Sequence, residues 1–356
     1  MSQQNAHPDT HPDMHKDVPF RIWVLSDGRP GHFNQAKGIV RAIALHRLVM
    51  SEWVPLKLRV GLFRNIMRQL LNRTRGPLSL EILAWFYAIK LPDDKPDMIV
   101  SSGGRTSFAT AWLGRVYKVP TVFSGSLRGL SAKHFSAVIS ILPQPDIVNA
   151  IVLPVMPSMV DPQLLQEIQM PANLANRTCW TMLVGGDGAG YQYQEMDWLL
   201  LANMMNKMAD RFQISWLICS SPRTGQQAEQ CLKIHLNADV VLRAHWYSED
   251  QSSVLLTCLA AAKRIFVTED SMTMLTEAIC SGKPVCSLSP QSCHPDLRYQ
   301  GSMQQYAKQT GMQRYAIEAL ATDPERLDFS PLPSAGCTYR EQLADQLLPL
   351  LKETGQ

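Results

Sequence analysis

The sequence of 356 residues predicts an α/β protein of two Rossmann-like lobes, whose parallel sheets face a central cleft. The prediction starts from two segments in opposite halves of the chain, 21–35 and 264–285. In each segment an apolar run of strand length ends at small or charged residues, and helical spacing then begins. Such junctions are where open α/β sheets bind their ligands. One junction in each half therefore indicates two lobes with a cleft between them.

Strands and helices alternate regularly through the first half of the chain, which indicates a parallel sheet with right-handed crossovers. The expected strands are 22–26, 96–102, 120–123 and 137–142, and the expected helices are 35–46 and 106–116. The segment 143–162 contains five prolines and is predicted to link the lobes. We therefore assign the first domain to residues 19–155.

The second half repeats this plan, and we assign the second domain to residues 156–325. The expected strands are 179–184, 214–220, 240–242 and 265–268, and the expected helices are 193–211, 225–236 and 252–262. The last segment, 326–356, is predicted to be helical, and its part with helical spacing, 342–352, is expected to cross back onto the first lobe. Residues 1–18 are polar, contain prolines and are predicted to form a disordered tail.

Composition excludes several classes of protein. Apolar residues make up 46% of the chain, which is enough for two hydrophobic cores. The formal charge of +3 is too small to indicate nucleic-acid binding, which usually shows as a dense basic stripe. No apolar run reaches the roughly eighteen residues of a membrane span, and the N-terminus lacks the apolar segment of a signal peptide. The protein is therefore expected in the cytoplasm, with its eight cysteines reduced.

The loop 27–32 contains three polar side chains of different chemistry within six residues. It brings a carboxylate, a guanidinium and an imidazole to one strand end. Asp27 and His32 are the candidate catalytic residues, because either could accept a proton from a hydroxyl group. The alternative is a structural turn, which Asp27 caps and in which His32 bonds helix amides. Other residues near strand ends are expected to bind a ligand or to line the cleft: Arg29, Gly31, Asn34, Gln35, Gly103, Gly104 and Arg105.

A glycine-rich loop, 185–190, follows a predicted strand in the second half. Its amides, with Gly186 as the candidate, can approach a phosphate or a sugar closely. The spacing is neither that of a dinucleotide-binding fingerprint nor that of a P-loop. A tight turn without a ligand therefore stays open as the alternative.

The strand-to-helix junction of the second half is the other candidate binding site. Asp270 or Ser271 is expected to cap the helix, and Glu277 lies two turns into it. A carboxylate at that depth can face the cleft and accept the two hydroxyls of a ribose. The charges of Glu269 and Asp270 would repel a diphosphate, but Arg223 at a neighbouring strand end could offset them. The alternative is an ordinary capped helix with a solvated Glu277.

At these positions the chain resembles the ELM family, which is named for plant mitochondrial-fission factors and whose bacterial members are described as glycosyltransferases. The resemblance covers most of residues 20–290. It rests on four motifs: Ser-Asp-Gly-Arg-Pro-Gly-His-x-Asn-Gln, Pro-Asp-x-Ile-Val-x-Ser-Gly-Gly-Arg, Ser-Pro-Arg-Thr, and Thr-Glu-Asp-Ser-Met-x-Met-x-x-Glu-Ala-x-x-x-Gly-Lys-Pro-Val.

This resemblance implies a GT-B-like fold, similar to that of the two-lobed glycosyltransferases that make peptidoglycan precursors. It implies that a nucleoside-diphosphate sugar binds the second lobe as a substrate, with Glu277 on the ribose and the helix start at Ser271 and Met272 on the phosphates. The first lobe would bind the acceptor. No cofactor is implied, and the chain lacks an Asp-x-Asp motif. We therefore expect a mechanism without a metal, in which Arg223 and helix amides hold the leaving group.

The segment 53–80 contains no acidic residue, and its basic residues alternate with apolar ones. Arg64 and Arg68, together with Leu62, Ile66 and Leu70, have the spacing of a basic amphipathic helix. Such a helix favours contact with an anionic membrane surface. The alternative is a core-packed helix with solvated arginines. A peripheral position on the inner face of the membrane would suit a lipid-linked or lipopolysaccharide-type acceptor.

Two other functions stay open. A hydrolysing nucleotide-sugar epimerase has the same two-lobed fold but needs no second substrate. A non-catalytic adaptor of the mitochondrial-fission type needs neither a base nor a donor site. Asp27, His32, Arg223 and Glu277 all fall at expected cleft positions, which weighs against an adaptor. The resemblance implies a glycosyltransferase, and a membrane-bound acceptor would place it in cell-envelope glycoconjugate synthesis.

Overall fold

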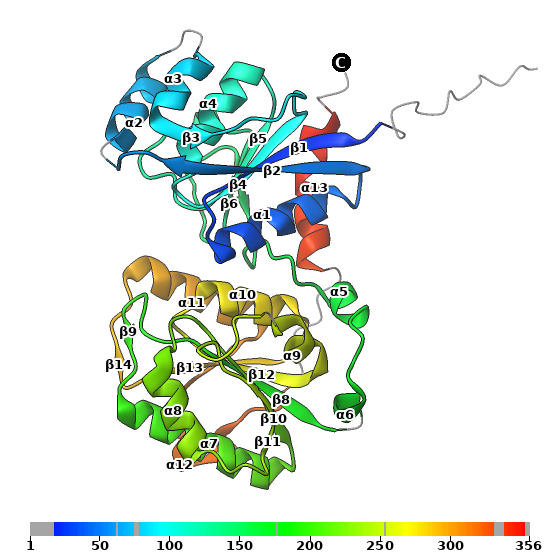
Figure 1. Ribbon diagram of the computed structural model, residues 1–356, viewed down its shortest axis with the longest axis vertical. Coiled ribbons are helices and arrows are strands. Elements are labelled where there is room, and N and C mark those ends of the chain that lie inside the picture. The colour runs from blue at the N-terminus through cyan, green and yellow to red at the C-terminus, as the bar shows by residue number, and fades with distance from the viewer. Residues whose placement is uncertain are drawn as a thin grey trace, which may run out of the picture.

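The protein consists of two lobes, one above the other, each built on its own largely parallel sheet (Figure 1). The computed structural model describes residues 18–352 except 62, 75–77, 176, 253 and 331–337. Of the predicted disordered tail, all but Val18 lies outside the described residues. The predicted fold class, two α/β lobes with parallel sheets, is confirmed.

The first lobe contains a seven-stranded sheet in the order β3-β2-β1-β4-β5-β6-β7, parallel except between β2 and β3. Its strands are β1 (Phe20–Ser26), β2 (Val49–Leu58), β3 (Tyr87–Ile89), β4 (Met98–Ser102), β5 (Thr121–Ser124), β6 (Ala137–Ser140) and β7 (Ala150–Val152). Its helices are α1 (Pro30–Ile43), α2 (Phe63–Arg73), α3 (Leu80–Phe86), α4 (Ser107–Tyr117) and the short 3-10 helix η1 (Ala132–His134).

The second lobe contains a six-stranded parallel sheet in the order β11-β10-β8-β12-β13-β15, and a small antiparallel pair, β9 and β14. The strands are β8 (Cys179–Val184), β9 (Tyr191–Gln192), β10 (Ser215–Ser220), β11 (Val241–His245), β12 (Ala262–Thr268), β13 (Val285–Ser289), β14 (Ser292–Cys293) and β15 (Gln313–Ala316). The helices are α5 (Pro162–Gln166), α6 (Ala172–Ala175), α7 (Glu195–Phe212), α8 (Gly225–His235), α9 (Leu255–Ala261), α10 (Met272–Cys280), α11 (Leu297–Thr310), α12 (Ile317–Thr322) and η2 (Pro324–Arg326). One more helix, α13 (Tyr339–Lys352), follows them in the chain.

Some elements differ from the sequence prediction. Helix α1 begins at Pro30 rather than at residue 35, because proline at the first helical position has a suitable φ and needs no amide donor. His32 and Asn34 therefore lie on a helix rather than in a loop. Strand β7 lies inside the proline-rich segment 143–162 and pairs with β6, so the linker predicted there was too long.

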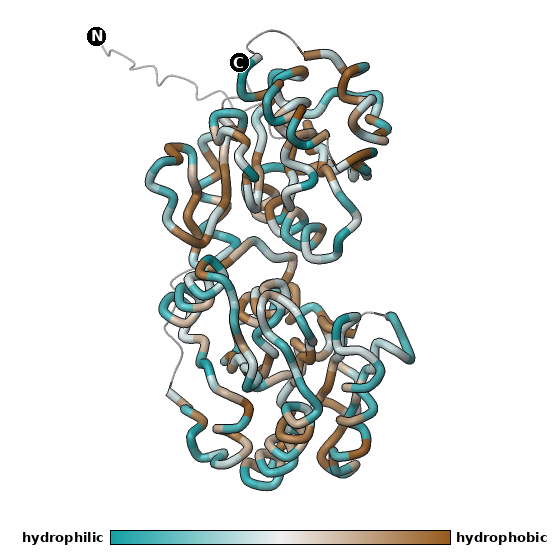
Figure 2. The backbone as a smooth tube through the Cα atoms, turned by 90° about the vertical axis from the view of Figure 1, so that its left-hand side faces the viewer, coloured by the Kyte–Doolittle hydropathy of each residue, from teal (hydrophilic) through white to brown (hydrophobic). Residues whose placement is uncertain are grey.

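Helix α13 belongs to the core of the first lobe, although it follows the second lobe in the chain. Leu343 and Leu347 of α13 are buried in the same cluster as Ile39 and Ala42 of α1. Figure 1 shows α13 beside α1, and Figure 2 shows hydrophobic segments gathered along the sheet of each lobe. The chain therefore crosses between the lobes twice.

A buried carboxylate fixes the first of these crossings. Asp161 accepts hydrogen bonds from Arg41 of α1 at 3.0 Å and from Arg340 of α13 at 2.7 Å. Close by, Gly38 of α1 touches the backbone of Ser158, since a Cβ atom at this glycine would lie 2.5 Å from the Ser158 nitrogen. The linker is thus attached to both helices that flank this edge of the first lobe.

Candidate functional site

The first candidate group is the hydrogen-bonded pair of Asp27 and His32, after the carboxyl end of β1. His32 Nδ1 lies 2.9 Å and 3.1 Å from the two carboxylate oxygens of Asp27. The side chain of Asp27 is 3% exposed and that of His32 is 28% exposed, so a buried carboxylate supports an accessible imidazole. A neutral imidazole that donates its Nδ1 proton keeps a lone pair on Nε2. Nε2 can therefore accept a proton from a hydroxyl group.

The glycines after β4 position this pair. Gly103 has a φ of +87°, and a Cβ atom there would overlap with the ring of His32. Only glycine therefore fits beneath the imidazole. Gly104 is packed in the same way against the side chain of Arg128. Both predicted cleft glycines thus act through packing in this structure.

The other first-lobe candidates divide into internal and exposed residues. Gln35 Oε1 accepts hydrogen bonds from Ser102 at 2.6 Å and from Ser124 at 3.2 Å. Gln35 therefore ties α1 to the carboxyl ends of β4 and β5. Arg29 and Arg105 are exposed and available to a ligand.

The two lobes meet at the start of α1. Asn34 Nδ2 donates a hydrogen bond of 2.6 Å to Glu277 Oε1 on α10. Gly31 also lies against α10, because a Cβ atom there would be 2.5 Å from Thr273 Oγ1. Glu277 is 4% exposed, and burial raises its pKa to about 7 although the Asn34 amide opposes the rise. Glu277 is therefore a buried residue between the lobes and not a solvated carboxylate.

Helix α10 starts at the carboxyl end of β12, on the side of the second lobe that faces the first (Figure 1). Ser271 is its N-cap, and the Ser271 hydroxyl accepts a hydrogen bond of 3.4 Å from the Met274 amide. The first amides of the helix, including that of Met272, leave partial positive charge at this end. Such a helix start is suited to a phosphate group.

The two acidic residues before α10 are each paired with an arginine. Glu269 is 1% exposed and accepts two parallel hydrogen bonds of 2.8 Å from Arg314. The Asp270 side chain is fully buried and lies 2.8 Å from Arg223 Nη2. Burial raises the pKa of Asp270, and the charge of Arg223 opposes the rise. Both negative charges are therefore offset locally.

The glycine-rich loop packs against this same pair. A Cβ atom at Gly185 would overlap with the Asp270 carboxylate, and one at Gly186 would overlap with the Arg223 carbonyl. The glycines therefore allow the loop to approach both residues closely. The close contact with Arg223 is a sufficient structural reason for glycine at position 186.

The sequence profile of the family described as mitochondrial fission ELM1 matches residues 30–334, which span both lobes and both sides of the Asn34 to Glu277 contact. The chain belongs to the mitochondrial fission ELM1 family. Among curated proteins, an uncharacterised protein of Rickettsia prowazekii is 24% identical to this ELM1-family chain. The alignment is 352 residues long and covers 88% of this chain and 95% of the relative.

Solved structures share the fold of this ELM1-family chain. The UDP-GlcNAc 2-epimerase of Methanocaldococcus jannaschii has a TM-score of 0.53 and 11% identity, and the match covers 94% of this chain and 100% of that one. The S. aureus MnaA structure with UDP has a TM-score of 0.51 and 11% identity, over 92% of this chain and 91% of that one. At such low identity the likeness shows the fold, which is GT-B-like.

Sequence reasoning missed the residues that neutralise Glu269 in this ELM1-family chain. Arg314 lies on β15, 45 residues after Glu269, and no local pattern links the two. Tyr191 and Tyr299 donate hydrogen bonds to the Glu269 carboxylate and carbonyl, at 3.0 and 2.6 Å. The order of the strands, with β13 between β12 and β15, brings Arg314 to Glu269.

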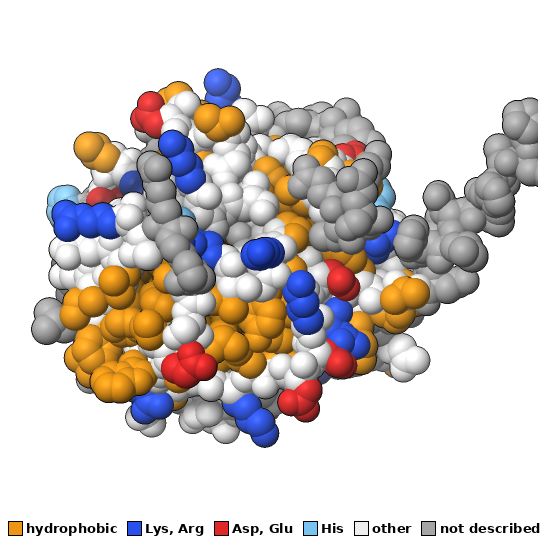
Figure 3. Space-filling model, turned by 90° about the horizontal axis from the view of Figure 1, so that it is seen from above, with side chains coloured by type: hydrophobic (Ala, Val, Ile, Leu, Met, Phe, Trp, Pro, Cys, Tyr) orange, Lys and Arg blue, Asp and Glu red, His pale blue; other side chains and the backbone are white. Residues whose placement is uncertain are grey.

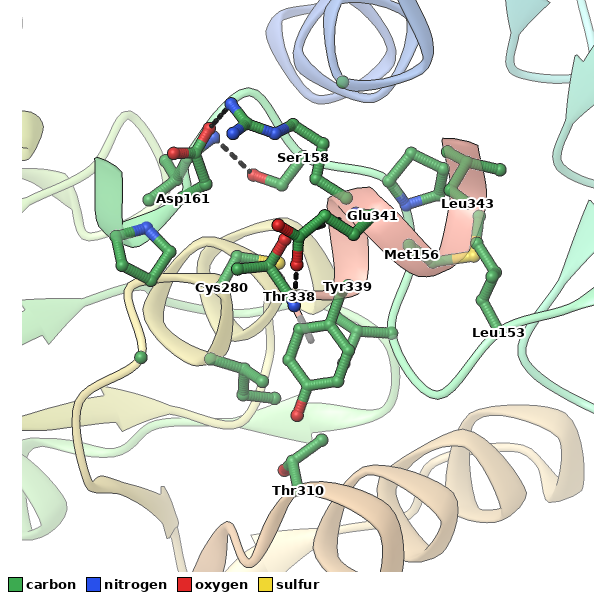
Figure 4. Close-up of a pocket in the computed structure, with 18 of the residues that line it drawn as sticks. Leu153, Met156, Ser158, Asp161, Cys280, Thr310, Thr338, Tyr339, Glu341 and Leu343 are labelled. Atoms are coloured by element: carbon green, nitrogen blue, oxygen red, sulfur yellow. Dashed lines mark hydrogen bonds and ion pairs between the residues drawn. The ribbon is translucent and has the colours of Figure 1, made fainter. Parts of the chain in front are cut away.

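A cavity of about 530 Å³, also unforeseen, lies beside the linker between the lobes (Figure 4). It is lined by linker residues such as Met156, by Cys280 at the end of α10, and by Tyr339 at the start of α13. Ser271 lies at the opposite end of α10 from Cys280. The cavity is therefore separate from the candidate site.

None of the described His, Cys, Asp and Glu residues form a cluster of three or more that could hold a metal ion. Within the same ranges, no helix combines the length and apolarity needed to cross a membrane. The seven cysteines that the structure describes are free thiols.

Proposed function

We propose that this chain is a glycosyltransferase that moves a sugar from a nucleoside-diphosphate sugar to an acceptor hydroxyl. The observation that carries the proposal is the contact between α1 and α10. Asn34 and Glu277 are joined by a hydrogen bond of 2.6 Å, and His32 lies on the same first part of α1 as Asn34. A donor bound at α10 would therefore present its sugar close to the pair of Asp27 and His32.

The donor would bind the second lobe. Glu277 would accept the hydroxyls of the ribose, and the amides at Ser271 and Met272 would bind the diphosphate. Arg223, which is 41% exposed, would add positive charge near the leaving group. The M. jannaschii 2-epimerase, which has this fold, was solved in complex with UDP-GlcNAc and UDP, and this supports a nucleotide-sugar ligand.

The first lobe would supply the base. Asp27 would hold the Nδ1 proton of His32, and His32 Nε2 would take the proton of the acceptor hydroxyl as its oxygen attacks the anomeric carbon. The bond from that carbon to the diphosphate oxygen would break, and the diphosphate would leave with the electron pair. Helix amides of α10 would stabilise its negative charge.

An acceptor of the lipid-linked or lipopolysaccharide type, used in cell-envelope glycoconjugate synthesis, fits the outer surface of the first lobe. The segment 53–80 forms β2 and α2 and leads into α3. Ile66 of α2 and Ile82 and Trp85 of α3 are 46%, 48% and 79% exposed. Figure 3, a view of the first lobe from above, shows hydrophobic side chains gathered on part of this face, with Lys and Arg side chains and some Asp and Glu side chains at its edges. Such a surface suits peripheral contact with an anionic membrane.

Calorimetry of the full chain with UDP, GDP and ADP sugars tests donor binding. We expect one nucleotide class to bind, and Glu277→Gln to weaken it at least about tenfold because the ribose hydroxyls lose a charged acceptor. Glu318→Gln, a change at an exposed carboxylate of the same lobe, is the control. Failure of all three classes to bind would contradict the proposal.

A hydrolysing epimerase is the second candidate, because the solved structure with a TM-score of 0.53 is a 2-epimerase. Product analysis without any acceptor separates the two reactions. An epimerase would convert the bound sugar nucleotide by itself, whereas a glycosyltransferase would need the acceptor. An adaptor without catalytic activity would do neither and would not bind the donor.

A further inference from the structure

A second depression, of about 670 Å³, lies at the end of the first lobe that faces away from the cleft. Thr121, at the start of β5, lines the depression. Ser124, at the end of the same strand, bonds to Gln35 beside the candidate site. The depression therefore opens at the opposite edge of the sheet from the site proposed for sugar transfer. None of the residues proposed for that reaction lines it.

Cationic and hydroxyl side chains line the depression. Arg115 belongs to the last turn of α4, and Lys133 and His134 belong to η1. The lining residues that carry hydroxyl or amide groups are Asn72, Thr74, Thr121, Ser131 and Ser136. No Asp or Glu is among the described residues of the lining. This combination selects an anion with several oxygen acceptors, of which phosphate is the commonest.

His134 is partly buried and lies near the positive charge of Arg115. Burial and the charge of Arg115 lower the pKa of His134. His134 Nε2 lies 3.2 Å from Asn72 Oδ1, which also accepts a hydrogen bond of 3.1 Å from the Ser131 amide. The end of α2 thus holds the imidazole at the rim, and an anion bound beside it would favour the protonated ring.

Helix α2 connects this depression to the exposed apolar surface of the first lobe. Ile66 is exposed on α2, and Asn72 follows it by roughly 9 Å along the helix axis. Phe63 of α2 packs edge-on against Phe86 of α3, with ring centroids 5.3 Å apart, and so holds α3 with its exposed Trp85 beside α2. Helix α2 therefore contributes Asn72 to the depression and Ile66 to the apolar surface.

We propose that this depression binds the phosphate of an anionic lipid headgroup while the apolar side chains of α2 and α3 enter the lipid surface. The proposal rests on the membrane contact proposed above, and it adds a defined headgroup site to it. A lipid with a phosphate monoester headgroup, such as phosphatidic acid, presents the most charge and the most acceptors to Arg115, Lys133 and His134.

The first test uses inorganic phosphate and the full chain. Phosphate should raise the melting temperature relative to chloride at equal ionic strength, because a ligand of the folded state stabilises it. Lys133→Gln with His134→Gln should abolish this rise, whereas Lys95→Gln, a change at an exposed lysine of the same lobe, should retain it. An equal rise in all three proteins would overturn the site.

The second test uses phosphatidylcholine vesicles that contain either phosphatidic acid or phosphatidylserine at matched surface charge. We expect tighter co-sedimentation with phosphatidic acid, weakened about fivefold or more by the double variant and reduced by inorganic phosphate. Phosphate binding without vesicle binding would identify a site for soluble phosphate and overturn the lipid assignment. Equal binding of both vesicle types by wild type and double variant would overturn the headgroup site.

Donor binding separates this proposal from the proposed reaction. The double variant should bind a nucleoside-diphosphate sugar as tightly as the wild type, since Lys133 and His134 lie at the other edge of the sheet. If phosphatidic acid binds but no sugar nucleotide does, the proposal of sugar transfer is wrong and the proposal of a headgroup site stands. If the donor binds and the vesicle preference is absent, the reaction stands and the headgroup site is wrong.

Discussion

Asn34 and Glu277 form a hydrogen bond of 2.6 Å that joins the two lobes of the protein. Glu277 is the carboxylate proposed to bind the donor ribose, and its Oε1 accepts the hydrogen bond of the Asn34 amide. A donor that bound this oxygen would have to displace the amide. The contact between the lobes and the proposed donor would therefore compete for one carboxylate.

We predict that Asn34→Ala raises donor affinity about fivefold, because the donor no longer has to break a hydrogen bond of about 1 kcal/mol. Calorimetry with the sugar nucleotide that binds the wild type checks this. Asn65→Ala, a change at an exposed asparagine of α2, is the control and should leave the affinity unchanged. A weaker affinity in Asn34→Ala would mean that Asn34 helps to bind the donor rather than competing with it.

Glu277 should make stability depend on pH. Its folded pKa is about 7, above its ordinary value of 4.5, so the folded protein binds this proton more tightly than the unfolded chain does. Its contribution to stability is therefore fully present below pH 4.5 and is lost as pH rises through about 7. The loss is on the order of 3 kcal/mol.

Urea unfolding of wild type and Glu277→Gln near pH 5 and near pH 8 measures this effect. Glutamine has the same shape and no charge, so the variant should gain stability over the wild type near pH 8 and much less near pH 5. The same difference between the proteins at both pH values would contradict a shifted carboxyl group.

The two sheets could be predicted because their strands are short apolar runs that alternate with helices, as at Met98–Ser102 and Cys179–Val184. Strand β2 was missed, since only Val54 and Leu56 are buried along it and Pro55 interrupts the pattern. Helix α3 was missed because its seven residues are too few for helical spacing to be recognised.

The candidate residues could be named from the sequence, but their pairing could not. Asp27 and His32 are five residues apart, so a contact between them follows from the local chain. Asn34 and Glu277 are 243 residues apart, and their contact depends on how the two lobes are placed. Local motifs therefore name the candidate residues and leave open which of them meet.

We predict that the pair of Asp27 and His32 controls turnover and not donor affinity. His32→Ala should lower kcat about 10²- to 10⁴-fold through loss of the base. Asp27→Asn should also lower kcat, because an amide no longer fixes the imidazole with its lone pair on Nε2. Donor affinity should stay near the wild-type value in both, since these residues lie on the other lobe.

Single-turnover transfer with saturating donor, once an acceptor is known, checks this prediction. His46→Ala, a change at a histidine just beyond the end of α1, is the matched control and should transfer at the wild-type rate. If His32→Ala also transfers at that rate, the base lies elsewhere, and the pair of Asp27 and His32 has a structural role only.

The ion pair of Arg223 and Asp270 should affect both stability and donor binding, and the two effects can be measured separately. Asp270 is fully buried, so Arg223→Gln leaves a buried carboxylate without its cation and should cost about 2 kcal/mol. This is below the value for a fully buried pair, because Arg223 is 41% exposed. Asp270→Asn combined with Arg223→Gln should recover most of the loss, since the remaining amide carries no charge.

The same variants should rank differently in donor affinity than in stability. Asp270→Asn releases Arg223 from its carboxylate, so the guanidinium can turn to the diphosphate and donor affinity should rise several-fold. The double variant should be stable but bind the donor weakly, because the cation is absent. A double-mutant cycle on urea unfolding and on calorimetric affinity measures both roles. If the double variant binds the donor as tightly as wild type, Arg223 acts only to neutralise Asp270, and α10 amides alone must hold the diphosphate.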